Sequence, residues 1–507
     1  MTVQRHRAHG SLRMTWIAAL AAIICAASDA GDAQGLPHAT PGLRAGLTLA
    51  PDSTGVIGVY NAAGPADTNN PFFRSLGTNG RSCSTCHLVS EAMSFTPEHA
   101  RQLYEQTDGA DPLFASTDGA NCPNSARTDR SAHSLILRSG LIRIALAVPA
   151  NAEYSISLVR DPTGCALRVD PSTNLLTASV YRRPLPSANL SFLSAIMFDG
   201  RETVSPLTTP NTFMMNLRAD LAHQAIDATT GHAQASEPPS DALVTEIVDF
   251  ELGLFTAQYA SHGAGRLDRG GAAGGPINLA LQHYYPGIND SLGADPLGLA
   301  FTPVSMTLYQ AWRSPHSEIE GDVFEARADI AAGEKLFNEL PITITNVRGI
   351  NDNPALGRPK SLSGHCATCH DTPNVGDHSL PLPLDIGTGH TADASFESDP
   401  LVRAAVSQLS APDLPVFLIS GCPNPFDATQ PESFYTTDPG KALVTGKCAD
   451  FNRVKGPILR GLAARAPYFH NGAAATLMEA VSFYDQRFQM RLTARQKRQL
   501  VAFLNSL

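Results

Sequence analysis

Two short motifs of the form Cys-x-x-Cys-His constrain this chain more than any other feature. They are Cys83-Ser84-Thr85-Cys86-His87 and Cys366-Ala367-Thr368-Cys369-His370. In this pattern two thiols bond to the vinyl groups of haem, and the adjacent imidazole binds the iron. A zinc site would need a second pair of Cys or His ligands, and neither motif has an obvious one nearby. The motifs therefore predict two covalently bound c-type haems, with His87 and His370 as iron ligands.

The first 33 residues have the pattern of an export signal. Arg5, Arg7 and Arg13 precede an apolar run over 16–27, and small residues over 28–33 offer cleavage sites. No later segment reaches the ~20 apolar residues that a membrane-spanning helix needs. We therefore expect residues 1–33 to be a signal peptide, and the mature protein to be soluble and periplasmic, without a membrane span.

The cysteines outside the motifs fit an oxidising location. Of nine cysteines, Cys25 lies in the export signal and four belong to the haem motifs. The other four, Cys122, Cys165, Cys422 and Cys448, form an even set that suits two disulfides. Neighbouring pairs are the simplest arrangement, Cys122 with Cys165 and Cys422 with Cys448, although the sequence does not fix the pairing.

The charge of the chain limits its partners. A net charge of -10 at pH 7 and a pI near 5.9 argue against nucleic acid or an anionic membrane surface. A basic redox protein, such as a small c-type cytochrome or a cupredoxin, is the more suitable partner.

The hydrophobic pattern predicts a mainly α chain with loop-rich insertions. Apolar residues recur every three or four positions over 217–228, 241–259 and 326–340, as in buried helices. Thr493 is the expected N-cap of a last helix that reaches Leu507. Residues 34–70 resemble an extended lead-in, and alternation over 154–159 indicates a minor β element. We expect two cytochrome c-like haem lobes, residues 34–325 and 326–507.

Three further blocks follow the second haem motif. They are Lys455-Gly456-Pro457-Ile458-Leu459-Arg460-Gly461, Ala466-Pro467-Tyr468-Phe469-His470-Asn471-Gly472 and Ala475-Thr476-Leu477-Met478-Glu479-Ala480-Val481. Together with both haem motifs, they resemble the di-haem cytochrome c peroxidase superfamily, which includes the MauG enzymes that mature methylamine dehydrogenase. Phe198-Asp199-Gly200-Arg201 is a weaker match, to the family's Trp-Asp-Gly-Arg. The stretch between the haem motifs is longer than usual in this superfamily, so large insertions are implied.

The resemblance places the sixth ligand of the second haem iron at Tyr484. Most peroxidases of the superfamily have Met there, whereas MauG-type enzymes have Tyr. A thioether ligand raises the reduction potential of the iron, and a phenolate lowers it and favours ferric or higher states. Such a haem would store oxidising equivalents rather than accept electrons from an ordinary cytochrome. The alternatives are that Tyr484 is a core aromatic residue and that Met478 or Met490 is the ligand.

The resemblance makes the haem at His87 the reactive one. Peroxide cleavage needs a group that takes a proton from the near oxygen and delivers it to the far oxygen. Gln224 matches the family's distal Gln, but where a Glu is expected the sequence reads Gly231-His232-Ala233-Gln234. His232 could replace that Glu, since imidazole shuttles protons near neutral pH. It could equally be a structural residue or an iron ligand, and His99 is a further distal ligand to consider.

Other family features concern the region between the haems. The family's Trp there aligns with Phe198, which is not readily oxidised to a stable radical, so direct tunnelling or a Tyr would have to carry the electron. Family members bind calcium through backbone carbonyls, which would fall here at Arg465 and Pro467. His470 would support the second haem, and a loop role is expected for His378.

These features predict a periplasmic di-haem c-type oxidoreductase of the peroxidase type. It would reduce hydrogen peroxide at the N-terminal haem with electrons relayed through the C-terminal haem. The alternatives are MauG-like or rubber-oxygenase-like oxidation of an organic or protein substrate, and a non-enzymatic electron-transfer cytochrome. The sequence leaves open the electron donor, the substrate, the oligomeric state and the role of the insertions.

Overall fold

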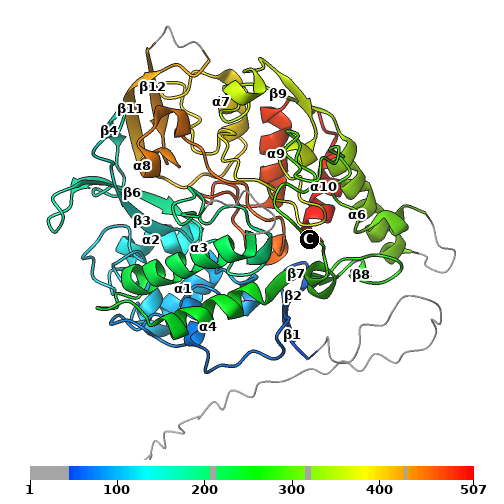
Figure 1. Ribbon diagram of the computed structural model, residues 1–507, viewed down its shortest axis with the longest axis horizontal. Coiled ribbons are helices and arrows are strands. Elements are labelled where there is room, and N and C mark those ends of the chain that lie inside the picture. The colour runs from blue at the N-terminus through cyan, green and yellow to red at the C-terminus, as the bar shows by residue number, and fades with distance from the viewer. Residues whose placement is uncertain (1–44, 206–212, 315–320, 427–430) are drawn as a thin grey trace, which may run out of the picture. The chain divides into compact units, whose positions relative to one another are not determined.

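A computed structural model describes residues 45–205, 213–314, 321–426 and 431–507 of this chain (Figure 1). The predicted signal peptide, residues 1–33, lies outside the described residues. The described helices are α1 (Pro97–Thr107), α2 (Ser134–Ser139), α3 (Phe213–Asp227), α4 (Asp241–Leu252), α5 (Pro276–Ala280), α6 (Asp322–Glu339), α7 (Pro400–Val406), α8 (Ala442–Thr445), α9 (Leu477–Arg487) and α10 (Ala494–Asn505).

The strands of the described chain form four small antiparallel sheets. In spatial order these are β1 (Leu47–Pro51), β2 (Gly55–Asn61), β7 (Leu254–Ser261) and β8 (Gly265–Arg266); β3 (Ile142–Ala147), β6 (Leu176–Arg182) and β5 (Leu167–Val169); β12 (Pro431–Thr436), β11 (Val416–Pro423) and β4 (Ser155–Arg160); and β10 (Leu362–Gly364) with β9 (Ile342–Ile344). The chain therefore contains more β structure than the one minor β element that was expected. Helices are also present, as the hydrophobic pattern predicts.

The predicted helices are confirmed where local signals define them. Helix α3 covers most of 217–228, α6 covers most of 326–340, and α10 begins after Thr493. The Thr493 hydroxyl accepts from the Gln496 amide, and the Gln496 side chain accepts from the Thr493 amide, which forms a capping box. Side chains of α6 and α10 interlock around Phe337 and Phe503.

The helix expected over 241–259 is wrong in its second half. Helix α4 ends at Leu252, and Gly253 donates its amide to the last helical carbonyls. The following residues form β7, which pairs with β2 along its length, from Gly55 with Ser261 to Asn61 with Leu254. The sequence over 34–70, expected to be an extended lead-in, thus supplies strand β2. Because residues 254–261 pair with β2, they form a strand and do not continue the helix. Cross-strand packing outweighs helical periodicity here.

The β element expected over 154–159 is confirmed as β4, but its partner comes from far along the chain. β4 pairs with β11, with Phe417 opposite Leu158 and Ile419 opposite Ile156. Figure 1 shows β4 beside β11 and β12, although their residue numbers differ by more than 250. This sheet joins the two expected haem lobes, so their division at residues 325 and 326 stays a prediction.

Both expected disulfides are confirmed. Cys122 bonds to Cys165 and Cys422 bonds to Cys448, with Cα separations of 5.9 and 5.6 Å. The second disulfide closes the end of β11 onto the segment that follows α8. No described helix is both long enough and apolar enough to span a bilayer.

Candidate functional site

Each Cys-x-x-Cys-His motif forms a tight 3₁₀ turn in the wall of its own cavity. The turns cover Cys83–Thr85 and Cys366–Thr368, and the cavities measure about 180 and 210 Å³. None of the four motif cysteines forms a disulfide, so all four thiols are available for thioether bonds. The spacing that the sequence shows is thus matched by a shared local fold.

Both motif histidines are held as metal ligands are. Nδ1 of His87 donates to the Met93 carbonyl at 2.9 Å, and Nδ1 of His370 donates to the Gly376 carbonyl at 3.3 Å. This bond fixes the tautomer and leaves the Nε2 lone pair free for iron. Burial lowers the pKa of both imidazoles, to about 4 for His370, which keeps them in the neutral form that binds metal.

A buried arginine in the wall of the first cavity also fits a haem. Arg460 lines the first cavity, and its Nε and Nη2 atoms have no hydrogen-bond partner among the described residues. A buried guanidinium without a partner is costly, and a carboxylate is the group that satisfies it best. Haem carries two propionate carboxylates, so the motif cysteines, the neutral imidazole and Arg460 together suit this cofactor.

The two cavities share a wall. Arg183, Pro184, Leu185, Phe198 and Lys455 line both of them. The segment that begins at Lys455 is extended, and its side chains alternate: those at 458 and 460 line the first cavity, and those at 457 and 459 line the second. The block Lys455–Gly461 of the resemblance therefore forms part of the partition between the candidate haem sites.

The structure brings Gln224 and His232 to the first cavity. Gln224 projects from α3, and His232 ends the π-helical turn that continues α3. Nδ1 of His232 hydrogen-bonds to the carboxylate of Asp118, and the other oxygen of that carboxylate pairs with Arg81. π-helical turns occur often at functional sites, because they displace one side chain from the helical register.

Asp118 is the residue of this site that the sequence did not reveal. It is 5% exposed, and burial alone would raise its pKa, but the charges of Arg81 and His232 outweigh burial and lower that pKa to about 2. The carboxylate is therefore ionised at neutral pH. It fixes the Nδ1 proton of His232 and leaves Nε2 of that ring for the cavity.

Tyr484 lines the second cavity from α9. Its ring lies 6.1 Å from the rings of Phe469 and Phe488, and burial raises the pKa of its hydroxyl. Among the described residues, no hydrogen-bond partner of this hydroxyl is present. Of the alternative ligands, Met490 lines the same cavity, and Met478 is 37% exposed and lies outside it.

Of the other histidines considered from the sequence, two line the second cavity and one lines neither cavity. His378 and His470 are buried in the wall of the second cavity. The His470 ring lies 6.0 Å from Phe198, and its Nε2 lies 3.6 Å from a carboxylate oxygen of Asp438. His99 lies on α1 with its Nδ1 3.7 Å from Glu91 and lines neither cavity.

Glu251 is a second residue that the sequence analysis missed. It lies near the end of α4, lines the first cavity, and is 5% exposed. Burial raises its pKa to about 8, and its Oε2 atom has no hydrogen-bond partner among the described residues. A charged residue at a buried position of an amphipathic helix is the only sequence signal that could have identified it.

The residues expected to bind calcium do not fit that ion. Arg465 and Pro467 line the second cavity, but the Arg465 carbonyl accepts a hydrogen bond from Nη2 of Arg183 at 3.3 Å. Calcium takes about six to eight oxygen ligands and prefers negative ones. Here one carbonyl is already bonded to a guanidinium, and the Arg465 side chain adds a second positive charge.

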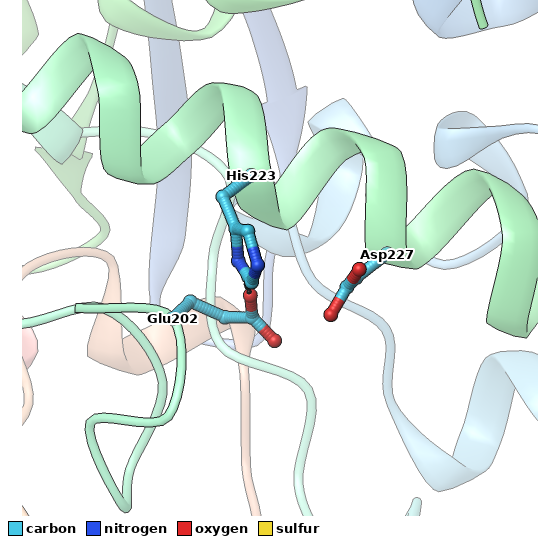
Figure 2. Close-up of side chains that lie close together, drawn as sticks. All are labelled: Glu202, His223 and Asp227. Carbon is cyan, nitrogen blue, oxygen red and sulfur yellow. Dashed lines mark hydrogen bonds and ion pairs between the residues drawn. The ribbon is translucent and has the colours of Figure 1, made fainter. Parts of the chain in front are cut away.

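Among the described residues, one group of side chains outside the cavities has the geometry of a metal site. Glu202, His223 and Asp227 offer ligand atoms within 4.8 Å of one another, and Figure 2 shows them pointing toward a common point. Nδ1 of His223 already lies 2.7 Å from the Glu202 carboxylate, and Nε of Arg201 lies 3.5 Å from it. A guanidinium so close repels a cation, and we assign no metal here.

This chain is similar to known proteins over part of its length or at low identity. No family model matches this sequence. Cytochrome-c peroxidase IdrP2 of Denitromonas iodatirespirans is 31% identical over 156 residues, which are 28% of this chain and 36% of that protein, so the match spans about a third of the relative. A solved structure described as a MauG-like protein associated with microbial copper homeostasis shares 15% identity, with 86% of this chain and 87% of that chain covered and a TM-score of 0.32.

Proposed function

We propose that this chain is a di-haem c-type oxidoreductase of the cytochrome c peroxidase superfamily that reduces hydrogen peroxide, since 156 of its residues align with a cytochrome-c peroxidase at 31% identity. The observation that carries the proposal is the pair of cavities, each with its own Cys-x-x-Cys-His turn and a common wall. Haem, when bound, supplies an iron that accepts and passes on single electrons. The export pattern of the first 33 residues suits a periplasmic location, where a small redox protein would deliver the electrons.

The side chains of the first cavity are suited to move the proton that peroxide cleavage requires. Nε2 of His232 can accept a proton from the near oxygen of peroxide and return it to the far oxygen. Asp118 stabilises the imidazolium that forms in between, because its carboxylate stays ionised beside Nδ1. The Gln224 amide can donate a hydrogen bond to the bound oxygen and orient it. His232 and Asp118 would thus replace the distal Glu of the family.

The two cavities are proposed to have unequal roles. His87 would hold the reactive haem, with Gln224 and His232 on the substrate side. His370 and Tyr484 would hold the iron of the second haem, which would supply a site that passes or stores electrons. Phe198 lines both cavities, and its ring resists oxidation, so the electron would tunnel past it directly.

A MauG-like oxidation of an organic or protein substrate is the second candidate function. One observation favours it: Tyr484 lines the second cavity, and its hydroxyl forms no hydrogen bond with another described residue. A phenolate ligand stabilises oxidised iron, which suits an enzyme that holds two oxidising equivalents until a slow substrate arrives.

Rapid mixing of the haem-loaded protein with peroxide tests the proposal. We expect both haem spectra to change within one catalytic cycle, and the haem content to be two per chain by alkaline pyridine spectra. A matched experiment with dioxygen and a reductant measures oxygen uptake. Fast oxygen uptake without reaction with peroxide would point instead to an oxygenase, and two low-spin haems that react with neither oxidant would leave only electron transfer.

A further inference from the structure

Arg183 forms an unusual set of contacts at the wall that the two cavities share. Its Nη1 donates to the Gly140 carbonyl at 2.8 Å, and its Nη2 donates to the carbonyls of Phe95 at 2.6 Å and Arg465 at 3.3 Å. Its Cζ also lies 5.6 Å from the centre of the Phe95 ring. A single buried guanidinium thus binds three backbone carbonyls, two from the first expected lobe and one from the second.

Gly140 makes room for this arrangement. A Cβ atom on Gly140 would lie 1.8 Å from Nη1 of Arg183, so any other residue there would displace the guanidinium. Gly140 also ends α2 in the left-handed region, with φ of +59°, where glycine is favoured. The absence of a side chain at Gly140, in the first expected lobe, therefore leaves the space that the Arg183 guanidinium occupies.

The guanidinium carries its charge in this position. Burial and the nearby charge of Arg465 lower the pKa of Arg183 to about 9, although Glu91 opposes them. A pKa of about 9 keeps the group protonated at neutral pH. Since Arg465 lies close enough to act on Arg183, a divalent ion there would meet two guanidinium charges, against the carboxylate of Glu91.

We propose that the Arg183 guanidinium is a built-in cation that takes the place of the calcium ion expected between the haem lobes. It binds the Arg465 carbonyl, one of the two carbonyls expected to bind calcium, and it holds the Phe95 and Gly140 segments against the Arg465 segment. Because Arg183 lines both cavities, its charge also acts on both haem sites. It is a positioning residue and has no contact with a reacting atom.

The inference predicts that the protein needs no calcium. The haem-loaded protein should contain no stoichiometric calcium by elemental analysis, and calorimetric titration with calcium chloride should show no binding. Dialysis against a calcium chelator should leave the melting temperature and both reduction potentials unchanged. Stoichiometric calcium in the purified protein, or a lower melting temperature after chelation, would overturn the inference whether or not the protein reacts with peroxide.

Arg183→Met tests the charge itself, since Met keeps much of the side-chain volume. A buried cation favours the reduced form of a nearby haem, so its loss should lower both reduction potentials, as measured by spectroelectrochemistry. Gly140→Ala should do the same by displacing the guanidinium. Gly357→Ala controls for strain, because Gly357 also has a positive φ but no atom within 4 Å of an added Cβ.

Arg487→Met is the matched control for a buried arginine. Arg487 binds the carbonyls of Thr345, Asn346 and Ile386 at 3.0 Å, all within the second expected lobe, and lines neither cavity. Its loss should lower the melting temperature and leave both potentials unchanged. If Arg183→Met lowers the melting temperature but also leaves both potentials unchanged, its charge does not act on the haem sites and the inference fails.

Discussion

Asp118→Asn is the most informative change at the first cavity, because the amide keeps the shape of the side chain and removes its charge. The pKa of Asp118 falls from 3.8 to about 2 on folding, which corresponds to about 2 kcal/mol in favour of the ionised form. The change also leaves the buried Arg81 without its ion-pair partner, and breaking a buried pair costs roughly 3–5 kcal/mol. We therefore expect the free energy of unfolding at pH 7 to fall by roughly 2–5 kcal/mol.

The pH dependence follows from the sign of this shift. A carboxyl whose pKa is lower in the folded state contributes its full stabilisation above its unfolded pKa, here near 3.8. That contribution is lost as the pH falls toward about 2. Denaturant unfolding should therefore show a constant difference between wild type and Asp118→Asn from pH 5 to 7, and a smaller one below about pH 4.

The same variant tests the proposed proton transfer. General acid–base catalysis contributes roughly 10²–10⁴-fold to a rate, so His232→Gln should lower the rate of peroxide reduction by a factor in that range. Asp118 acts only through His232, so Asp118→Asn should lower the rate of wild type but add little to His232→Gln. Asp129→Asn removes an exposed N-cap carboxylate and serves as the control. Independent, multiplicative losses in the double variant would refute the coupling between Asp118 and His232.

Three further changes test other parts of the structure. Tyr484→Met should raise the reduction potential of the second haem, since a thioether replaces a phenolate, and an unchanged potential would remove Tyr484 from the ligand set. Burial raises the pKa of Glu251 to about 8, so its carboxyl destabilises the folded state as the pH rises from 4.5 to 8. Glu251→Gln should therefore be more stable than wild type at pH 9 and equal to it at pH 4 in denaturant unfolding. Cys422→Ser with Cys448→Ser opens a disulfide that spans 26 residues, and the free energy of unfolding should fall by roughly 3 kcal/mol.

Features that depend on neighbouring residues could be predicted from the sequence. The Cys-x-x-Cys-His turns need only five consecutive residues, and the capping box at Thr493 needs four. Helices α3 and α6 follow from their periodicity. The helix expected over 241–259 failed at Leu252, because strand β2, almost 200 residues earlier, pairs with the segment after Gly253.

Features that depend on distant residues could not be predicted. Asp118 and His232 are 114 residues apart, and the carbonyl of Arg465 lies 282 residues after Arg183. Neither pair is marked by a sequence pattern, because a single hydrogen bond between two distant segments imposes no spacing on the residues around it. Gly140 illustrates the same limit: in the sequence it is one glycine among 40, and only the structure shows that a side chain there would meet a guanidinium.

Residues that line only one cavity explain how two equal motifs could give unequal haems. His87 and His370 have the same hydrogen bond from Nδ1 to a backbone carbonyl, so the proximal side does not distinguish them. The difference lies in other residues of the cavity walls: the first cavity has His232 with the ionised Asp118 beside it, and the second has Tyr484 among aromatic rings. Changes at these distal residues should therefore alter one haem, whereas changes at the shared wall should alter both.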